Sequence, residues 1–229
     1  VGACEGGKIA GGGKGLVPGH PGGQGLVHIE SSDGYRIGPV GLFTVIAQFQ
    51  KGAIGQPGED AGVFRQKLRE LPVELTQKGV FRRAVAFPYV VEFQKRGLPH
   101  AHILLILCSA DKPKSPADVD HLVVAELPDP DTQPELYRAV TKHMLHGPCG
   151  ALNPNCSCMK EGICSKSYPK AFVDVTEYRA HGYPVYRRRR PPADAPAPPY
   201  PNYDNRWVVP YSPYLLLRFQ CHLNVEVCS

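Results

Sequence analysis

Two stretches in which apolar side chains recur at every second position constrain the fold of this chain most. The first covers residues 84–94, and the second covers residues 100–107. A period of two is typical of β-strands. Lys95–Pro99 lies between the two stretches and has the composition of a turn. The sequence therefore predicts an antiparallel β-hairpin, with Val85, Phe87, Tyr89, Val91 and Phe93 on one face of its first strand.

The second strand of this hairpin contains His100-Ala-His102. Residues two apart on a strand point to the same face, so the two imidazoles can bind one divalent metal. With a loop at 95–99, Gln94 lies opposite His100 and Glu92 lies opposite His102, with Cβ atoms about 5 Å apart. These four side chains form a polar patch that suits Mg²⁺, Mn²⁺ or Zn²⁺. The alternative is a solvent-exposed histidine pair without metal.

Two further segments have apolar residues at helical spacing. The first begins near Ala61 and continues to about Lys78, and we expect Pro72 to kink or split it. Its apolar face is formed by Phe64, Leu68, Leu71 and Leu75. The second opens with a capping box at Thr132–Glu135 and presents Leu136, Val140 and Met144 on one face.

The predicted fold class is α+β, with a central antiparallel sheet that contains the histidine hairpin, flanking helices and a Cys-rich insertion. We expect the helix at 64–75 to pack on the odd-numbered apolar face of the hairpin, leaving the metal patch on the other face. Further strands are predicted from short apolar runs. These runs are Val40–Ala47, Trp207–Val209, Tyr214–Leu217 and Asn224–Cys228.

The chain of 229 residues contains 24 Gly and 24 Pro, which predicts long irregular stretches. Residues 1–60 are Gly-rich and poorly specified, and residues 61–229 form the predicted domain. A Pro-rich linker is predicted at 191–201. No signal peptide and no apolar run long enough for a membrane span is visible, so we expect neither secretion nor a membrane.

Cysteines crowd into an insertion at about residues 143–170. Clustered cysteines in a chain that is not expected to be secreted favour metal over disulfides. The predicted ligands of a structural Zn²⁺ are His146, Cys149, Cys158 and Cys164. Cys156 competes with Cys158, and His143 competes with His146. Free thiols are the main alternative, and a disulfide is the weaker one.

The net charge of +5 permits a nucleic-acid partner without requiring one. Lys95 and Arg96 lie in the predicted turn, next to the metal patch, where they can neutralise phosphates. Arg187 and Arg188 belong to a run of four arginines, which is a second candidate for DNA binding or a nuclear localisation signal. A solvated run of charge is the alternative.

Glu92–Leu104 resembles the histidine–hydrophobic–histidine motif of Helitron transposases, in the replication-initiator-like domain that precedes their helicase. Further segments resemble the same family in the same order, from about residue 62 to the end of the chain. They are Val119–Leu127, His146–Gly150, Cys164–Lys166, Tyr168–Lys170, Gly182–Arg188, Asn205–Tyr211 and His222–Cys228. The resemblance implies a domain of the HUH endonuclease superfamily.

Members of that family nick and join single-stranded DNA, by attack of a tyrosine on a phosphate that a metal polarises. The resemblance implies that His100 and His102 bind this Mg²⁺ or Mn²⁺ ion, with Glu92 as the preferred third ligand and Gln94 as the alternative. It places the Tyr-x-x-x-Tyr nucleophiles beyond Ser229, so we expect no cleavage by these residues alone.

The resemblance also implies a C-terminal helicase in the same polypeptide and a nuclear location. Two other functions stay open at this point. One is a DNA-binding remnant without catalysis, and the other, less favoured, is an unrelated His-x-His metal hydrolase.

Overall fold

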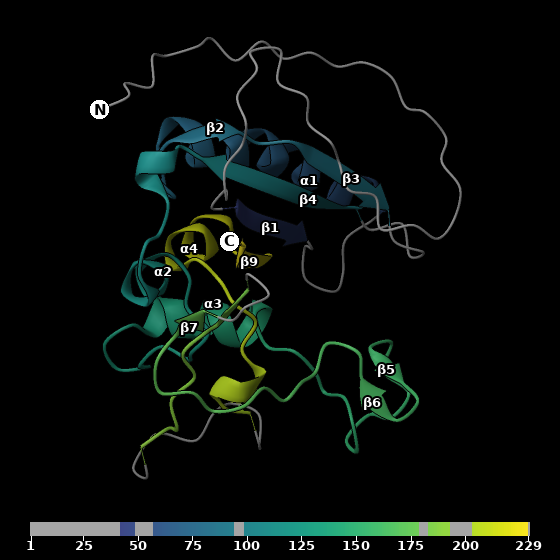
Figure 1. The fold of residues 1–229 in the computed structure, drawn as a ribbon. Coiled ribbons are helices and arrows are strands. Elements are labelled where there is room, and N and C mark those ends of the chain that lie inside the picture. Colours follow the sequence, from purple (N-terminus) through teal and green to yellow (C-terminus); the bar gives the residue numbers. More distant parts are fainter. Residues whose placement is uncertain (1–41, 49–56, 94–98, 179–182, 193–202, 229) are drawn as a thin grey trace. The chain divides into compact units, whose positions relative to one another are not determined.

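A computed structural model of the chain describes residues 42–48, 57–93, 99–178, 183–192 and 203–228, with side chains from Gly62 onward. All of them belong to one compact unit, Val40–Ser229. Helices and antiparallel sheets alternate along the chain (Figure 1), so the α+β class is confirmed. Within the described part, no helix is both long and apolar enough to cross a bilayer.

The main sheet is antiparallel and has five strands. Strand β1 (Leu42–Gln48) lies between β4 (Pro99–Leu107) and β9 (His222–Cys228), as Figure 1 shows. The other edge of β4 pairs with two short strands, β2 (Ala84–Ala86) and β3 (Tyr89–Phe93). The strand predicted from the apolar run Val40–Ala47 thus forms as β1, although the predicted domain began only at residue 61.

The first alternating stretch forms two strands instead of the single predicted one. Pro88 separates them, because proline has no N–H to donate to the ladder. Its carbonyl still accepts a hydrogen bond of 2.9 Å from the backbone N–H of Leu104. The register against β4 shifts between Ala84 and Ala86, upstream of this break. The break leaves β3 as a five-residue edge strand.

The register between β3 and β4 differs by two residues from the predicted one. Glu92 pairs with His100, and Val90 pairs with His102. The predicted opposition of Glu92 to His102 is therefore wrong, although both histidines remain on the same face as Glu92. Pro99 causes the difference, because it opens β4 opposite Phe93 instead of lying in the turn. A proline at the first residue of a strand costs little.

The odd-numbered face of β4 forms the core, as predicted. Helix α1 (Pro57–Pro72) packs on it through Phe64 and Leu71, and the π-helical turn η1 (Val73–Gln77) adds Leu75. These residues are buried in one cluster with Ala101, Ile103, Leu105, Leu107, Leu223, Val225 and Val227. The change of helix type after Pro72 fits the expected break at this proline.

Glu74 in η1 is a buried carboxylate that connects this turn to helix α4 (Pro213–Phe219). It accepts hydrogen bonds from Lys78 at 2.9 Å, from the Tyr214 hydroxyl at 2.8 Å and from Arg218 at 3.3 Å. Lys78 and Tyr214 lower the pKa of Glu74, so the group stays ionised. The bonds from Tyr214 and Arg218 therefore hold η1 against α4.

Two of the strands predicted in the C-terminal third of the chain are wrong. Trp207 belongs to a short 3₁₀ helix, η3 (Asn205–Trp207), and the run 214–217 lies inside α4. Pro213 opens α4, where its fixed φ suits a helix. Leu215, Leu216 and Phe219 are its buried residues, at a spacing that is helical and not alternating.

The other helices show where sequence signals for helix starts succeed and fail. Helix α3 (Pro134–His143) forms with Leu136 and Val140 buried, but Gln133 is its N-cap and the predicted capping box is absent. Thr132 instead donates its backbone N–H to Asp129. A capping box does form at α2 (Pro116–Leu122), with Ser115 as N-cap, and the sequence analysis missed it.

The remaining described elements are short. They are a 3₁₀ helix η2 (Ser109–Asp111) and the strands β5 (Met159–Lys160), β6 (Ile163–Cys164), β7 (Glu177–Tyr178) and β8 (Pro184–Val185). β5 pairs with β6, and β7 pairs with β8, both as antiparallel two-stranded sheets.

Candidate metal centres

Glu92 and the two histidines of β4 converge at the edge of the main sheet. Glu92 Oε2 lies 3.1 Å from His100 Nε2 and 3.5 Å from His102 Nε2. The two imidazole centroids are 4.7 Å apart, with the ring planes at 67°. One nitrogen or oxygen atom from each side chain lies within 4.8 Å of the others, close enough for one ion to contact all three. We call these three residues the edge triad.

The edge triad is closed on one side and open on the other. The side chain of His100 is 10% exposed, that of His102 is 39% exposed and that of Glu92 is 57% exposed. Nδ1 of His100 is buried and has no hydrogen-bond partner within the described part of the chain. Burial therefore restricts the imidazole of His100, while His102 and Glu92 face solvent on the side from which a substrate would approach.

The donor set of the edge triad fits a divalent cation with open coordination positions. Two imidazoles and a carboxylate combine nitrogen with hard oxygen, as Zn²⁺ and Mn²⁺ accept in catalytic sites. Three protein ligands leave room for water or for a phosphate oxygen. The fourth predicted ligand, Gln94, lies outside the described residues, as do Lys95 and Arg96.

A second group of ligands forms after helix α3. His146, Cys149, Cys158 and Cys164 place one nitrogen or sulfur atom each within 4.8 Å of the others. Cys164 Sγ lies 3.4 Å from His146 Nε2. Four ligands at about 2.0–2.3 Å from a tetrahedral Zn²⁺ are separated from one another by roughly 3.5–3.8 Å. We call these residues the Cys₃His cluster, and they can hold a metal such as zinc.

The two alternative ligands, Cys156 and His143, do not belong to this group of four. Cys156 Sγ is 3.6 Å from Cys158 Sγ but is not part of the group of four. His143 uses its backbone carbonyl to accept a hydrogen bond from His222 Nδ1, and burial lowers the pKa of its own side chain to about 4. None of the described cysteines forms a disulfide.

A short hairpin brings the last two thiols of the Cys₃His cluster together. Strands β5 and β6 pair Met159 with Cys164. The Ser165 backbone N–H donates to the carbonyl of Cys158 at 2.7 Å, which continues the pairing of the hairpin beyond Met159 and Cys164. Gly162 adopts a φ of +79° at the tip, a conformation that glycine accepts without strain.

Aromatic residues, which the sequence analysis missed, surround the Cys₃His cluster. The Tyr168 ring stacks on His146 at 4.1 Å between centroids, with 13° between planes. Trp207 and Tyr203 are buried against the same cluster. Gly147 is required beneath them, since its φ is +125° and a Cβ there would lie 2.6 Å from the Tyr203 hydroxyl. The Tyr168-Pro and Arg206-Trp pairs were visible as motifs, but no spacing rule links them to a metal.

The protonation of the Cys₃His cluster depends on whether a cation is bound. Desolvation, with hydrogen bonds from neighbouring thiols, raises the pKa of Cys158 to about 12 when no ion is present. Desolvation lowers the pKa of His146 and keeps its imidazole neutral, as a metal ligand must be. A divalent cation would stabilise the thiolates that crowding otherwise disfavours.

Arg188 is an interior residue, 4% exposed. Its Nη1 atom lies within hydrogen-bond distance of three backbone carbonyls, those of Ala125 at 3.2 Å, Asn205 at 2.6 Å and Val208 at 2.6 Å. The guanidinium therefore joins three segments that are far apart in sequence. A role of Arg188 in binding DNA phosphates does not fit this position, because the side chain is already enclosed and bonded.

The neighbouring arginines also have partners inside the protein. Arg187 lies 3.3 Å from Asp120, and Arg189 pairs with Glu126 at 2.7 Å. Arg190 lies over the Phe172 ring at 4.6 Å. The arginine run therefore connects the residues after β8 to α2 and to the segment that follows α2. The predicted DNA-binding role of Arg187 fits poorly with its ion pair. Sequence could not reveal this, since the carboxylates lie more than 60 residues upstream.

Replacing Arg188 with alanine is expected to destabilise the fold by about 3 kcal/mol, because the buried carbonyls of Ala125, Asn205 and Val208 lose their donor. Urea unfolding followed by circular dichroism measures the change. Arg190→Ala is the matched control from the same run, and it should cost no more than about 1 kcal/mol, the scale of an exposed cation–π contact. Equal losses from the two variants would contradict the assigned role of Arg188.

Residues 45–105 match the family model described as the Helitron helicase-like domain at the N-terminus. The matched range includes α1, the strands β2 and β3, and all three residues of the edge triad. The predicted resemblance to the Helitron N-terminal domain is confirmed over this range. No curated protein is significantly similar to the chain.

Proposed function

We propose that this chain, whose residues 45–105 match the family model of the Helitron helicase-like domain, binds single-stranded DNA through a divalent cation held by the edge triad. We further propose that the complete protein nicks and joins that strand by attack of a tyrosine. The observation that carries the proposal is the convergence of Glu92 Oε2 on the Nε2 atoms of His100 and His102, at 3.1 and 3.5 Å.

The three side chains have distinct parts in this proposal. His100 is nearly enclosed and defines where the ion lies, while His102 and Glu92 complete the site from the solvent side. The bound cation supplies charge stabilisation on a non-bridging phosphate oxygen. The three side chains would hold that cation where solvent, and therefore a strand and a nucleophile, can approach it. The fixed antiparallel pairing of β3 with β4 keeps the three ligands in position.

The nucleophile is expected from the family in a helix that follows the segment ending at Cys228. We therefore expect residues 1–229 to bind DNA without forming a covalent adduct. Tyr186, Tyr203 and Tyr211 are buried, which fits the expectation that they do not attack DNA. Tyr183 and Tyr214 are exposed, and the Tyr214 hydroxyl donates to Glu74 at 2.8 Å.

The Cys₃His cluster has a structural part in the proposal. The backbone N–H of His146 donates to the carbonyl of Trp207 at 2.9 Å, and that of Val209 donates to the carbonyl of Met144 at 2.7 Å. A Zn²⁺ ion in the cluster would thus fasten the Cys-rich segment to the strands and turns that precede α4. We expect this chain to act together with a helicase in the same polypeptide, and to act in the nucleus.

Fluorescence anisotropy with a labelled single-stranded oligonucleotide tests the proposed function. Protein that already carries its structural zinc is titrated with and without Mn²⁺, because a chelator would also remove the zinc. We expect Mn²⁺ to tighten binding at least tenfold, and affinity to fall steeply with salt as phosphate contacts require.

The other outcomes separate the competing functions. Binding that is equally tight without Mn²⁺ would favour a DNA-binding remnant. Metal-dependent phosphoester hydrolysis without affinity for single strands would favour the unrelated hydrolase. A covalent protein–DNA adduct would contradict the expectation that the nucleophile lies beyond Ser229.

A further inference from the structure

Cys156 is a thiol beside the Cys₃His cluster that the cluster does not use. Its Sγ atom lies 3.6 Å from Sγ of the ligand Cys158, yet Cys156 is not one of the four ligands. The ligands of a tetrahedral Zn²⁺ are separated from one another by about the same distance, roughly 3.5–3.8 Å. Cys156 is therefore as close to one ligand sulfur as the ligands of such a site are to one another.

The backbone holds these two sulfur atoms near each other. The backbone N–H of Met159 donates to the carbonyl of Cys156 at 2.8 Å, which closes a tight turn that contains both cysteines. The N–H of Cys156 donates in turn to the carbonyl of Asn153 at 3.2 Å. Met159 then begins β5 and pairs with Cys164. The turn is thus anchored to the hairpin that carries the last ligand of the cluster.

Access from solvent distinguishes Cys156 from the other thiols of this segment. Cys149 and Cys164 are buried, whereas Cys156 and Cys158 are only partly buried. A bound Zn²⁺ would protect Cys158, because the metal draws on the lone pair with which this sulfur would react. Cys156 would keep an accessible sulfur without a bond to the ion. Cysteines that respond to oxidants are accessible in this way and lie next to a second thiol.

We infer that Cys156 is a site of oxidation by peroxides, and that a disulfide between Cys156 and Cys158 then releases the zinc ion. This inference rests on the structural zinc of the proposed function and adds what would control its retention. The oxidant is a hydroperoxide, with hydrogen peroxide as the simplest member of the class. The two sulfur atoms have to approach from 3.6 Å to the length of a disulfide bond, about 2.05 Å.

The chemistry takes two steps. The Cys156 sulfur attacks one oxygen of hydrogen peroxide and the O–O bond breaks, and the leaving hydroxide takes the thiol proton, which gives a sulfenic acid and water. The Cys158 thiolate then leaves the metal and attacks the sulfenic sulfur, so that the S–S bond forms and the S–O bond breaks. The second hydroxide takes a proton from solvent. Two electrons pass in total from the sulfur atoms to the peroxide.

The disulfide would leave only three ligands for the ion, His146, Cys149 and Cys164. A structural zinc site needs four, so the ion should dissociate. Because the backbone N–H of His146 donates to the carbonyl of Trp207, loosening of the Cys-rich segment should reach the residues that precede α4. Reduction of the disulfide in the presence of Zn²⁺ should restore the site.

The rate of zinc release from the zinc-loaded chain tests the inference. Hydrogen peroxide is added in excess, and a chromogenic chelator that binds zinc weakly reports the release. We expect one Zn²⁺ per chain to be released, and peptide mass mapping early in the reaction should find a disulfide between Cys156 and Cys158. Cys156→Ser keeps all four ligands. It should release zinc about tenfold more slowly, because the accessible thiolate is gone.

Cys228→Ser is the matched control, because Cys228 is also only partly buried but ends strand β9 of the main sheet. It should release zinc at the rate of the unchanged chain. If Cys156→Ser releases zinc as fast as the unchanged chain, or if the early disulfide joins other cysteines, the inference is wrong and the zinc site stands. Oxidation of Cys156 with retention of zinc would also refute it. A purified chain without zinc would refute the structural zinc itself.

Discussion

Cys164→Ser is expected to release one Zn²⁺ per chain and to unfold the segment around the Cys₃His cluster. Cys164 is 6% exposed, pairs with Met159 in the β5–β6 hairpin and lies 3.4 Å from His146. Few apolar side chains hold this segment. Its buried cluster consists mainly of two ligand thiols with Tyr203 and Trp207, so the metal supplies most of its stability.

The expected loss of stability for Cys164→Ser is at least about 5 kcal/mol. Structural zinc contributes roughly 10–16 kcal/mol in small zinc-binding peptides, and part of this remains when three ligands are left. Because the backbone of His146 bonds to Trp207, unfolding should spread to the turns that precede α4. Hydrogen exchange should therefore show lost protection at Trp207 and Val209 as well as in the hairpin.

Cys156→Ser is the matched control. Its sulfur is only 3.6 Å from that of Cys158, yet it is not among the four ligands. It should keep one zinc per chain by elemental analysis and should unfold at the same urea concentration as the unchanged chain. If both cysteine changes release zinc equally, or if the purified chain carries none, the assignment of this cluster is wrong.

His102→Ala is expected to lower the affinity for Mn²⁺ at least 100-fold and to remove the metal dependence of DNA binding. An ion with three protein ligands loses a third of them, and Nε2 of His102 cannot be replaced by any described side chain of the edge triad. His102 is the better choice than His100, because its side chain is 39% exposed and its loss leaves no large cavity.

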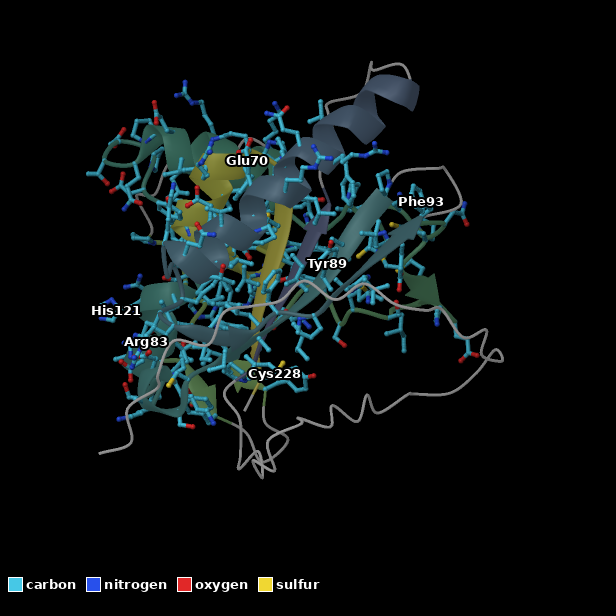
Figure 2. The ribbon with its side chains drawn as sticks, turned by 90° about the horizontal axis from the view of Figure 1, so that it is seen from above. Glu70, Arg83, Tyr89, Phe93, His121 and Cys228 are labelled. Carbon is cyan, nitrogen blue, oxygen red and sulfur yellow. The ribbon has the colours of Figure 1, made fainter. Side chains whose placement is uncertain are left out.

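His121→Ala provides the control for the loss of an imidazole. This residue lies at the end of α2, is exposed and is labelled in Figure 2 away from β3. Isothermal titration with Mn²⁺ should show one site in the unchanged chain and in His121→Ala. Unfolding in urea should be similar for all three proteins. Equal Mn²⁺ affinity in His102→Ala would remove the edge triad as the binding site.

The sequence predicted the residues of the edge triad better than it predicted their pairing. Alternation placed His100 and His102 on one face with Glu92, and this parity survived a register error of two residues. The error arose at Pro99, since proline is a turn signal but is equally acceptable as the first residue of a strand. Parity depends only on the backbone pleat, whereas register depends on where the turn begins.

The four members of the Cys₃His cluster were the ligands that the sequence favoured, because metal ligands are identified by residue type and spacing. Spacing alone left Cys156 and His143 as alternatives. The surroundings could not be predicted, since Tyr168 and Trp207 reach the cluster through tertiary packing. The arginine run shows the opposite failure. Charge alone suggested a surface for DNA, but the carboxylates and carbonyls that bind Arg187 and Arg188 come from distant segments.

Locating Mn²⁺ by anomalous X-ray scattering in crystals of the zinc-loaded chain tests the central claim most directly. We predict one Mn²⁺ ion about 2.2 Å from Nε2 of His100, Nε2 of His102 and a carboxylate oxygen of Glu92. A separate zinc signal should lie among His146, Cys149, Cys158 and Cys164. Manganese bound elsewhere, or His100 and His102 turned away from each other with no ion between them, would contradict the account.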